Sequence, residues 1–117
     1  MIKFIKPEVR VIGTGWVASA ATTIYLAAKK ENRYSLPNTR YLVHQPSGGS
    51  QGDATDISIQ AEQIIKTKAR INKLIADETG RPVEQVEKDT DRDYWMSVDE
   101  AIDYGIVTKV IASSSEL

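Results

Sequence analysis

The sequence predicts an α/β fold in one small domain. Strand-like apolar runs alternate with segments of helical apolar spacing, glycine and proline separate them, and 117 residues leave room for a single modest core. We expect the order β-α-β-α-α-α-β along the chain, with the domain at 1–112 and a short tail at 113–117.

The first unit is expected to be a strand, a sharp turn and a helix. The apolar run at 9–12 has the β-branched composition of a strand, and Gly13 and Gly15 interrupt it. Alanine, isoleucine and leucine then recur at helical spacing over 17–30. Two interpretations of the turn follow: a glycine turn that binds phosphate, or an elbow that exposes the hydroxyl of Ser19.

A second strand is expected at 40–45, after a turn that contains Pro37 and Asn38. This strand would have His44 near its C-terminal end. The segment that follows, 47–56, is polar and rich in glycine, so we expect a loop or an irregular extended segment there.

The longest expected element is an amphipathic helix over 55–79, which Gly80 would end. Its apolar stripe consists of Ile57, Ala61, Ile64, Ile71 and Ile75. At 1.5 Å per residue this helix would be roughly 37 Å long, which is more than a globule of this size requires. We therefore expect part of the helix to pack against a partner, so that the chain associates with other copies or chains.

Two short helices and a strand are expected to complete the domain. Ser97 and Glu100 form a capping box that predicts the start of the second helix, and Gly105 predicts its end. The expected ranges are 82–89 and 98–104 for the helices and 106–111 for the strand.

The composition excludes several classes of partner and site. The chain has 15 Lys and Arg against 16 Asp and Glu without a basic block, so we expect neither a nucleic-acid nor a membrane partner. The absence of cysteine excludes disulfides and thiolate metal sites. No apolar run has the length of a signal peptide core or a membrane span, and we expect a soluble cytoplasmic protein.

The turn at Gly13, Gly15 and Ala18 matches the G-x-G-x-x-A fingerprint of dinucleotide-binding folds. That fingerprint also needs an acidic residue at the end of the next strand, where it binds the ribose. The run at 40–45 contains no acidic residue, so we expect no nucleotide cofactor.

The acidic residues Asp89, Asp91, Asp93 and Glu100 have the spacing of calcium ligands 1, 3, 5 and 12 in an EF-hand loop. The sixth position of such a loop requires glycine for its sharp turn, and here it is Tyr94. We therefore expect a solvated acidic segment and no metal site.

A Ser-His-Asp arrangement is the third candidate chemistry. His44 is the only histidine and is suited to act as a base near neutral pH. Ser19 begins an expected helix, where the backbone amide of Ala20 could face a developing oxyanion. Asp93 could orient the imidazole, although the spacing alone does not show that the three residues converge.

Several segments together resemble the proteolytic subunit of the ATP-dependent Clp protease. They are "FIKPEV", "GTGWVASAA", "LPNTRYLVHQPSGGSQGDATDI", the long helix and "DTDRDYWMSVDEAIDYGIV", which together run from about Phe4 to Ile111. The resemblance implies the ββα superhelical fold that this family shares with crotonases, and this chain corresponds to its C-terminal part. It also implies that the long helix is the handle helix, which joins two rings of subunits in the family.

The resemblance implies roles for individual residues. It implies that Ser19 is the nucleophile, His44 the general base and Asp93 the acid that orients the histidine. It further implies that the glycine-rich segment lines the substrate path and meets the opposing ring, and that a charged pair links assembly to the triad. The glycines are Gly48, Gly49 and Gly52, and the charged pair is Asp91 and Arg92.

The partners implied by the resemblance are copies of the chain itself in heptameric rings, a Clp-family ATPase and polypeptide substrates, without a cofactor. The resemblance begins in the middle of the family's domain, and Ala20 and Ala21 replace a methionine and a small residue that commonly follow the nucleophile. We therefore expect impaired activity of the chain alone and co-assembly with a full-length paralogue. A non-catalytic subunit that acts in assembly only is the alternative, and an acyl-CoA-binding crotonase is disfavoured because the three triad residues have no role there.

Overall fold

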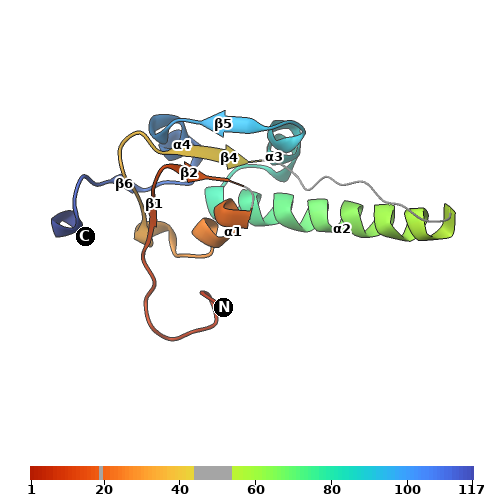
Figure 1. Cartoon of the computed structure of the whole chain (residues 1–117), viewed down its shortest axis with the longest axis horizontal. Helices are drawn as coiled ribbons and strands as arrows, with labels where there is room; N and C mark the ends of the chain where they lie inside the picture. Colours follow the sequence, from red (N-terminus) through yellow and green to blue (C-terminus); the bar gives the residue numbers. More distant parts are fainter. Residues whose placement is uncertain (19, 44–53) are drawn as a thin grey trace.

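The computed structural model describes residues 1–18, 20–43 and 54–117, and the molecule measures 56 × 31 × 25 Å (Figure 1). Within these ranges the strands form two three-stranded sheets. The first sheet is parallel and has the order β1 (Val11–Gly13), β3 (Arg33–Ser35), β6 (Lys109–Val110). The second has the order β2 (Trp16–Val17), β4 (Arg40–Val43), β5 (Tyr94–Met96). In this second sheet β2 is parallel to β4, and β5 is antiparallel to it.

Helices pack around the two sheets, which confirms the predicted α/β class. They are α1 (Ala20–Leu26), α2 (Ala54–Thr79), α3 (Val83–Thr90) and α4 (Val98–Tyr104). Two single 3₁₀ turns are η1 (Lys30–Asn32) and η2 (Ser114–Glu116). The second of these lies within 113–117, and the domain boundary at 112 stays a prediction.

The core lies between the second sheet, α1, α3, α4 and the last turns of α2. It is made of buried aliphatic and aromatic side chains, of which the largest fully buried are Tyr41, Leu26, Met96, Ile106, Val43 and Val86. The stretch 106–111 was expected to be one strand, but the ladder includes only Lys109–Val110. Ile106 and Val107 instead enter the core directly after α4.

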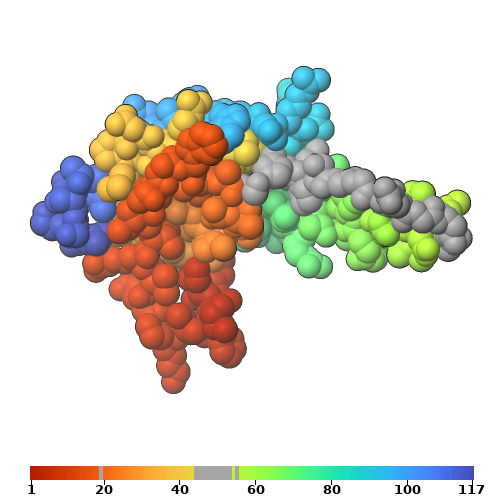
Figure 2. All heavy atoms as spheres, viewed as in Figure 1, coloured from red at the N-terminus to blue at the C-terminus, as the bar shows by residue number. Residues whose placement is uncertain are grey.

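The long helix α2 confirms its prediction to within one residue. Gly80 has φ +75° and donates its N–H to the carbonyl of Ala76, as expected of a residue that ends a helix. Ile75 and Ala76 in the last turns are buried, whereas Ile59 and Ile65 are 54% and 66% exposed. The first half of α2 therefore extends away from the globule (Figures 1 and 2). None of the helices in the described part of the chain is long and apolar enough to cross a membrane.

Three elements differ from the sequence-based expectation. The helix expected at 17–30 is the seven-residue α1, because Trp16–Val17 pair with β4 as β2. The strands β3 and β5 were not predicted. Both are only three residues long. Strand β3 consists of Arg33, Tyr34 and Ser35 and lacks the apolar run that marks a strand, whereas β5 is apolar but short and directly follows the charged residues 91–93.

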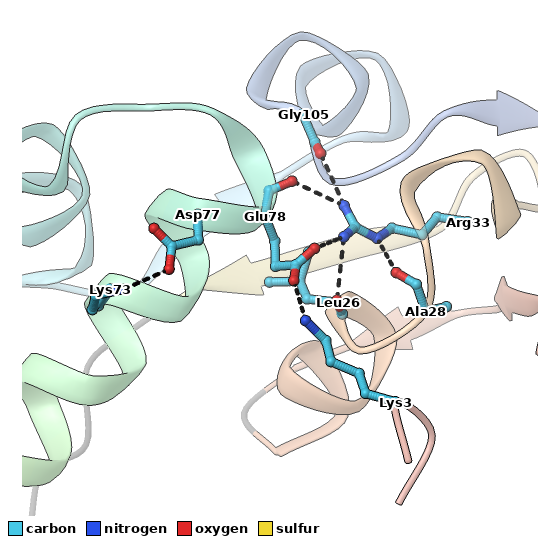
Figure 3. A network of polar contacts seen from close by, with 8 residues as sticks. All are labelled: Lys3, Leu26, Ala28, Arg33, Lys73, Asp77, Glu78 and Gly105. Carbon is cyan, nitrogen blue, oxygen red and sulfur yellow. Dashed lines mark hydrogen bonds and ion pairs between the residues drawn. The ribbon is translucent and has the colours of Figure 1, made fainter. Parts of the chain in front are cut away.

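A single buried guanidinium joins the ends of three helices (Figure 3). Arg33, the first residue of β3, is fully buried and uses all five of its N–H donors. It donates to the carboxylate of Glu78 and to four carbonyl oxygens at 3.1–3.3 Å, which belong to Leu26, Ala28, Glu78 and Gly105. A continued α1 would need the carbonyls of Leu26 and Ala28 for its own ladder, so their capture by Arg33 explains why α1 ends early.

The glycines of the first turn have separate structural causes. A Cβ atom on Gly13 would lie 2.1 Å from the hydroxyl oxygen of Tyr41, so the phenol ring of β4 requires a glycine there. Gly15 has open space around it but adopts φ +67°, which favours glycine. The G-x-G pattern is thus explained by packing and turn geometry within this chain.

We expect Arg33→Met to lower the free energy of unfolding by about 3–5 kcal/mol or to abolish cooperative unfolding, because it leaves buried carbonyls and Glu78 without their donor. Urea denaturation followed by circular dichroism measures this. Arg81→Met is the matched control, since Arg81 also donates to two backbone carbonyls, those of Tyr104 and Asp103, but is only half-buried. If Arg33→Met lost no more unfolding free energy than the control, about 1 kcal/mol, Arg33 would not be the residue that holds the three helix ends together.

We expect Tyr41→Phe to be neutral or stabilising, because the buried Tyr41 hydroxyl has no hydrogen-bond partner among the residues that the structure describes. Gly13→Ala should cost about 1–3 kcal/mol through overpacking, and the double variant should recover part of that loss. Equilibrium unfolding of the three variants provides the test. A loss above about 1 kcal/mol in Tyr41→Phe would instead reveal a partner for the hydroxyl.

Candidate active site

The three segments that carry the predicted triad meet at one edge of the second sheet. Strand β2 ends at Val17, β4 ends at Val43, and β5 begins at Tyr94, directly after Asp93. Since β2 and β4 are parallel and β5 is antiparallel to β4, the end of β2, the end of β4 and the start of β5 share an edge. In the register of the ladder Val43 lies opposite Tyr94.

Of the predicted site residues, Asp93 and Ala20 are among the described residues. Asp93 is exposed in the short connection between α3 and β5, and Ala20 is the exposed first residue of α1. Ser19 and His44 lie outside the described residues, as do Gly48, Gly49 and Gly52. Their predicted roles therefore stay predictions.

The start of α1 is held against both parallel strands by one hydroxyl. The buried Thr22 side chain donates to the carbonyl of Leu42 at 2.7 Å and lies 3.3 Å from the carbonyl of Val17. This contact fixes the first turn of α1, and with it the Ala20 amide, relative to the ends of β2 and β4. Sequence analysis missed Thr22, because nothing in its local sequence shows that two distant strands meet it.

The connection from α3 to β5 carries Asp91, Arg92 and Asp93. Asp91 still has helical backbone angles, φ −58° and ψ −30°, and all three residues are exposed. The chain then enters β5, where Tyr94 packs against Tyr104 with ring centroids 5.9 Å apart. The charged pair predicted at Asp91 and Arg92 thus lies at the surface next to Asp93, and its role stays a prediction.

The acidic residues of the EF-hand spacing do not form a common loop. Asp89 lies inside α3 and accepts hydrogen bonds from Gln85 and from the Tyr104 hydroxyl, each at 2.8 Å. Burial raises the pKa of Tyr104, and the neighbouring Asp89 carboxylate adds to the shift. Glu100 caps α4 through Ser97. Within the described ranges, no three His, Cys, Asp or Glu side chains come together in a group that could hold a metal ion.

An aromatic cluster lies on the same sheet and was not singled out from the sequence. Trp16 of β2 and Trp95 of β5 make an edge-to-face contact with ring centroids 5.6 Å apart, and Arg40 of β4 lies 5.8 Å from the Trp95 ring. Trp16 is 73% exposed and Trp95 38%. The cluster therefore forms a mixed aromatic and cationic surface near the candidate site.

Comparison with known proteins identifies a family. A family model described as Clp protease matches residues 1–114. The chain is 58% identical over all its 117 residues to an ATP-dependent Clp protease proteolytic subunit 3 from Rhizobium etli, of which it covers 60%. It is 56% identical to an ATP-dependent Clp protease proteolytic subunit from Paracoccus denitrificans, of which it covers 59%.

A solved structure shares the fold. The ClpP1 N165D mutant from Listeria monocytogenes superposes with a TM-score of 0.89 and is 60% identical, over 97% of this chain and 63% of that one. The fold that the sequence resemblance implied is thereby confirmed. The chain spans about 60% of the length of the curated relatives that it matches.

The capping box that starts α4 gives a prediction for pH dependence. Hydrogen bonds from the Ser97 backbone and side chain lower the pKa of Glu100 below its ordinary value of 4.5. A lowered folded-state pKa means that the Glu100 charge stabilises the fold above pH 4.5, and that this contribution is lost as the pH falls through the lowered value. The difference in unfolding free energy between the parent chain and Glu100→Gln should therefore be largest near neutral pH and disappear in acid.

Urea unfolding at a series of pH values measures this difference. Glu87→Gln is the control, because it removes one exposed carboxylate from α3 outside any capping box. If the control shows the same pH-dependent difference, the effect belongs to net charge rather than to the capping box.

Proposed function

The chain belongs to the Clp protease family, and from this premise we propose that it is a subunit of a cytoplasmic ATP-dependent serine protease that cleaves unfolded polypeptides. The observation that carries the proposal is the common edge of the second sheet, where β2 ends near Ser19, β4 ends before His44 and β5 begins after Asp93. Parallel strands deliver side chains from distant segments to one place, which is what a triad requires.

The proposed chemistry is acyl transfer to water. The Ser19 oxygen attacks the carbonyl carbon of a peptide bond while His44 takes the serine proton, and His44 then gives this proton to the leaving amine as the C–N bond breaks. A water molecule attacks the acyl-enzyme, again with His44 as base, and regenerates Ser19. Asp93 orients the imidazole and stabilises its charged form.

The amide of Ala20 is proposed as one donor to the oxyanion that forms at the attacked carbonyl. Its position in the first turn of α1 supports this role, since the first N–H groups of a helix have no partner within the helix. Thr22 supports it as well, because its hydrogen bond to Leu42 ties that turn to β4.

Assembly is the second part of the proposal and also supplies the alternative function. The exposed Ile57, Ile59 and Ile65 lie on the half of α2 that leaves the globule, which is the kind of apolar surface that a partner covers. We propose that α2 contacts copies of this chain or a full-length paralogue, with the glycine-rich segment and the Asp91–Arg92 pair beside that contact, and that a Clp-family ATPase supplies substrate. If the triad does not work in this chain, this surface favours an assembly-only subunit.

A fluorophosphonate probe tests the catalytic proposal, because it labels only activated serines. We expect labelling of the parent chain and of Ser58→Ala, which removes an exposed serine on α2, and none of Ser19→Ala or His44→Ala. Turnover of a fluorogenic peptide should likewise depend on Ser19 and His44.

The same assay is repeated after mixing with a catalytically inactive full-length relative. Turnover that rises on mixing and vanishes with Ser19→Ala supports a competent site completed by its partner. Labelling that persists in Ser19→Ala contradicts the assigned nucleophile. No labelling and no turnover in either sample leaves the assembly-only function.

A further inference from the structure

Thr90 is a fully buried polar residue at the point where α3 ends, three residues before Asp93. Its hydroxyl oxygen lies 2.8 Å from the carbonyl oxygen of Val86 in its own helix and 2.9 Å from the side-chain oxygen of Asn72 in α2. The hydroxyl has one proton, which these two acceptors share, and the first contact is the ordinary one of a threonine to the preceding turn. The second connects two helices and needs a separate explanation.

Asn72 faces this hydroxyl from the buried side of α2. Its side chain is 3% exposed, with Ile75 and Ala76 buried in the next turn and Val86 fully buried on α3. In such surroundings a hydrogen bond is strong and an unpaired polar group is costly. The Asn72–Thr90 pair therefore holds the end of α3 at one defined place along α2.

The connection 91–93, which joins α3 to β5, is also held at its other end. Tyr94 pairs with Val43 in the ladder of β4 and β5 and packs against Tyr104. Only residues 91–93 lie between the buried hydroxyl and the first residue of β5. With both ends anchored over so short a span, the position of Thr90 determines the direction in which the chain presents Asp93.

A second polar contact of α3 is made with a different helix. Asp89 accepts from Tyr104, and this bond ties α3 to α4 at the half-buried surface. It orients α3 about its axis but makes no contact with α2. The buried Asn72–Thr90 bond is the described polar contact that sets how far α3 sits along α2.

We propose that Asn72 and Thr90 are positioning residues for Asp93: their buried hydrogen bond sets the geometry of the 91–93 connection and so the approach of the carboxylate to the catalytic histidine. The inference rests on the proposed function. It extends the site to two buried residues, one on α2 and one on α3.

The kinetic test compares Thr90→Val, which keeps the shape and removes the hydroxyl, with Thr90→Ser, which keeps the hydroxyl. It uses whichever sample shows Ser19-dependent turnover of a fluorogenic peptide, the chain alone or the chain mixed with the inactive relative. We expect Thr90→Val to lower kcat by about 10- to 10²-fold with KM little changed, because a small displacement of a catalytic group has effects of that size. Thr90→Ser should restore kcat.

Thr79→Val is the matched control. Thr79 is likewise a buried threonine at the last position of a helix, and its hydroxyl donates to the carbonyl of Ile75, without a bond to another helix. The control should lose thermal stability to a similar degree and keep kcat. Equal loss of kcat in Thr79→Val and Thr90→Val would overturn the proposal, because it would attribute the effect to stability.

A second readout does not depend on catalysis. Trp95 lies two residues after Asp93 and, in a Trp16→Phe background, is the only tryptophan of the chain. Thr90→Val and Asn72→Leu should change the Trp95 emission spectrum in the same way and should speed amide hydrogen exchange at 91–96. The double variant should change Trp95 emission and amide exchange no more than either single variant does, since the two residues form one contact.

The two readouts separate failure of this inference from failure of the proposed function. A chain that never labels or turns over substrate fails the proposed function, and Trp95 then still reports whether the pair sets the 91–96 geometry. Unchanged Trp95 emission and exchange in folded Thr90→Val would overturn the positioning role even if the chain is an active protease.

Discussion

The fold depends on one cation at the convergence of three helix ends. The last carbonyls of every helix lack partners within the helix, and the aligned peptide dipoles make that end negative. Arg33 satisfies such carbonyls for α1 at Leu26, for α2 at Glu78 and next to α4 at Gly105, and Glu78 also provides the counter-charge. A buried arginine is thus stabilised by the helix ends it connects, and Lys3 extends the network to the N-terminal segment through Glu78.

This network explains how α2 can extend so far from a small domain. The helix is fixed at its C-terminal end by Arg33, by Ile75 in the core and by Asn72, which accepts a hydrogen bond from Thr90. Its first half needs no support from the globule, so Ile59 and Ile65 stay exposed and available to another chain. The same anchored end of α2 sets the position of α3, and α3 leads to Asp93. The part of the molecule proposed for association and the part proposed for catalysis therefore share one junction.

The sequence correctly predicted those features that residues close together in the chain determine. Gly80, the box of Ser97 with Glu100, and Gly105 were read correctly, because each feature is formed by residues within one turn of the chain. The length of α1 and the strand β3 were missed, because both depend on Arg33, whose partners are up to 72 residues away and whose charge argues against burial. The spacing of residues in the sequence likewise could not predict that the site segments meet, since this follows from strand order and register.

Strand β4 contacts each of the segments that lead to the candidate site, and these contacts position them. Its Tyr41 occupies the space that makes Gly13 necessary, which fixes the turn leading to β2. The next residue, Leu42, accepts the hydrogen bond of Thr22 and so fixes the start of α1. Val43 then pairs with the first residue of β5, just after Asp93. Three consecutive residues of one strand thus determine where each segment of the proposed triad begins or ends, and these positions follow from the packing of the core.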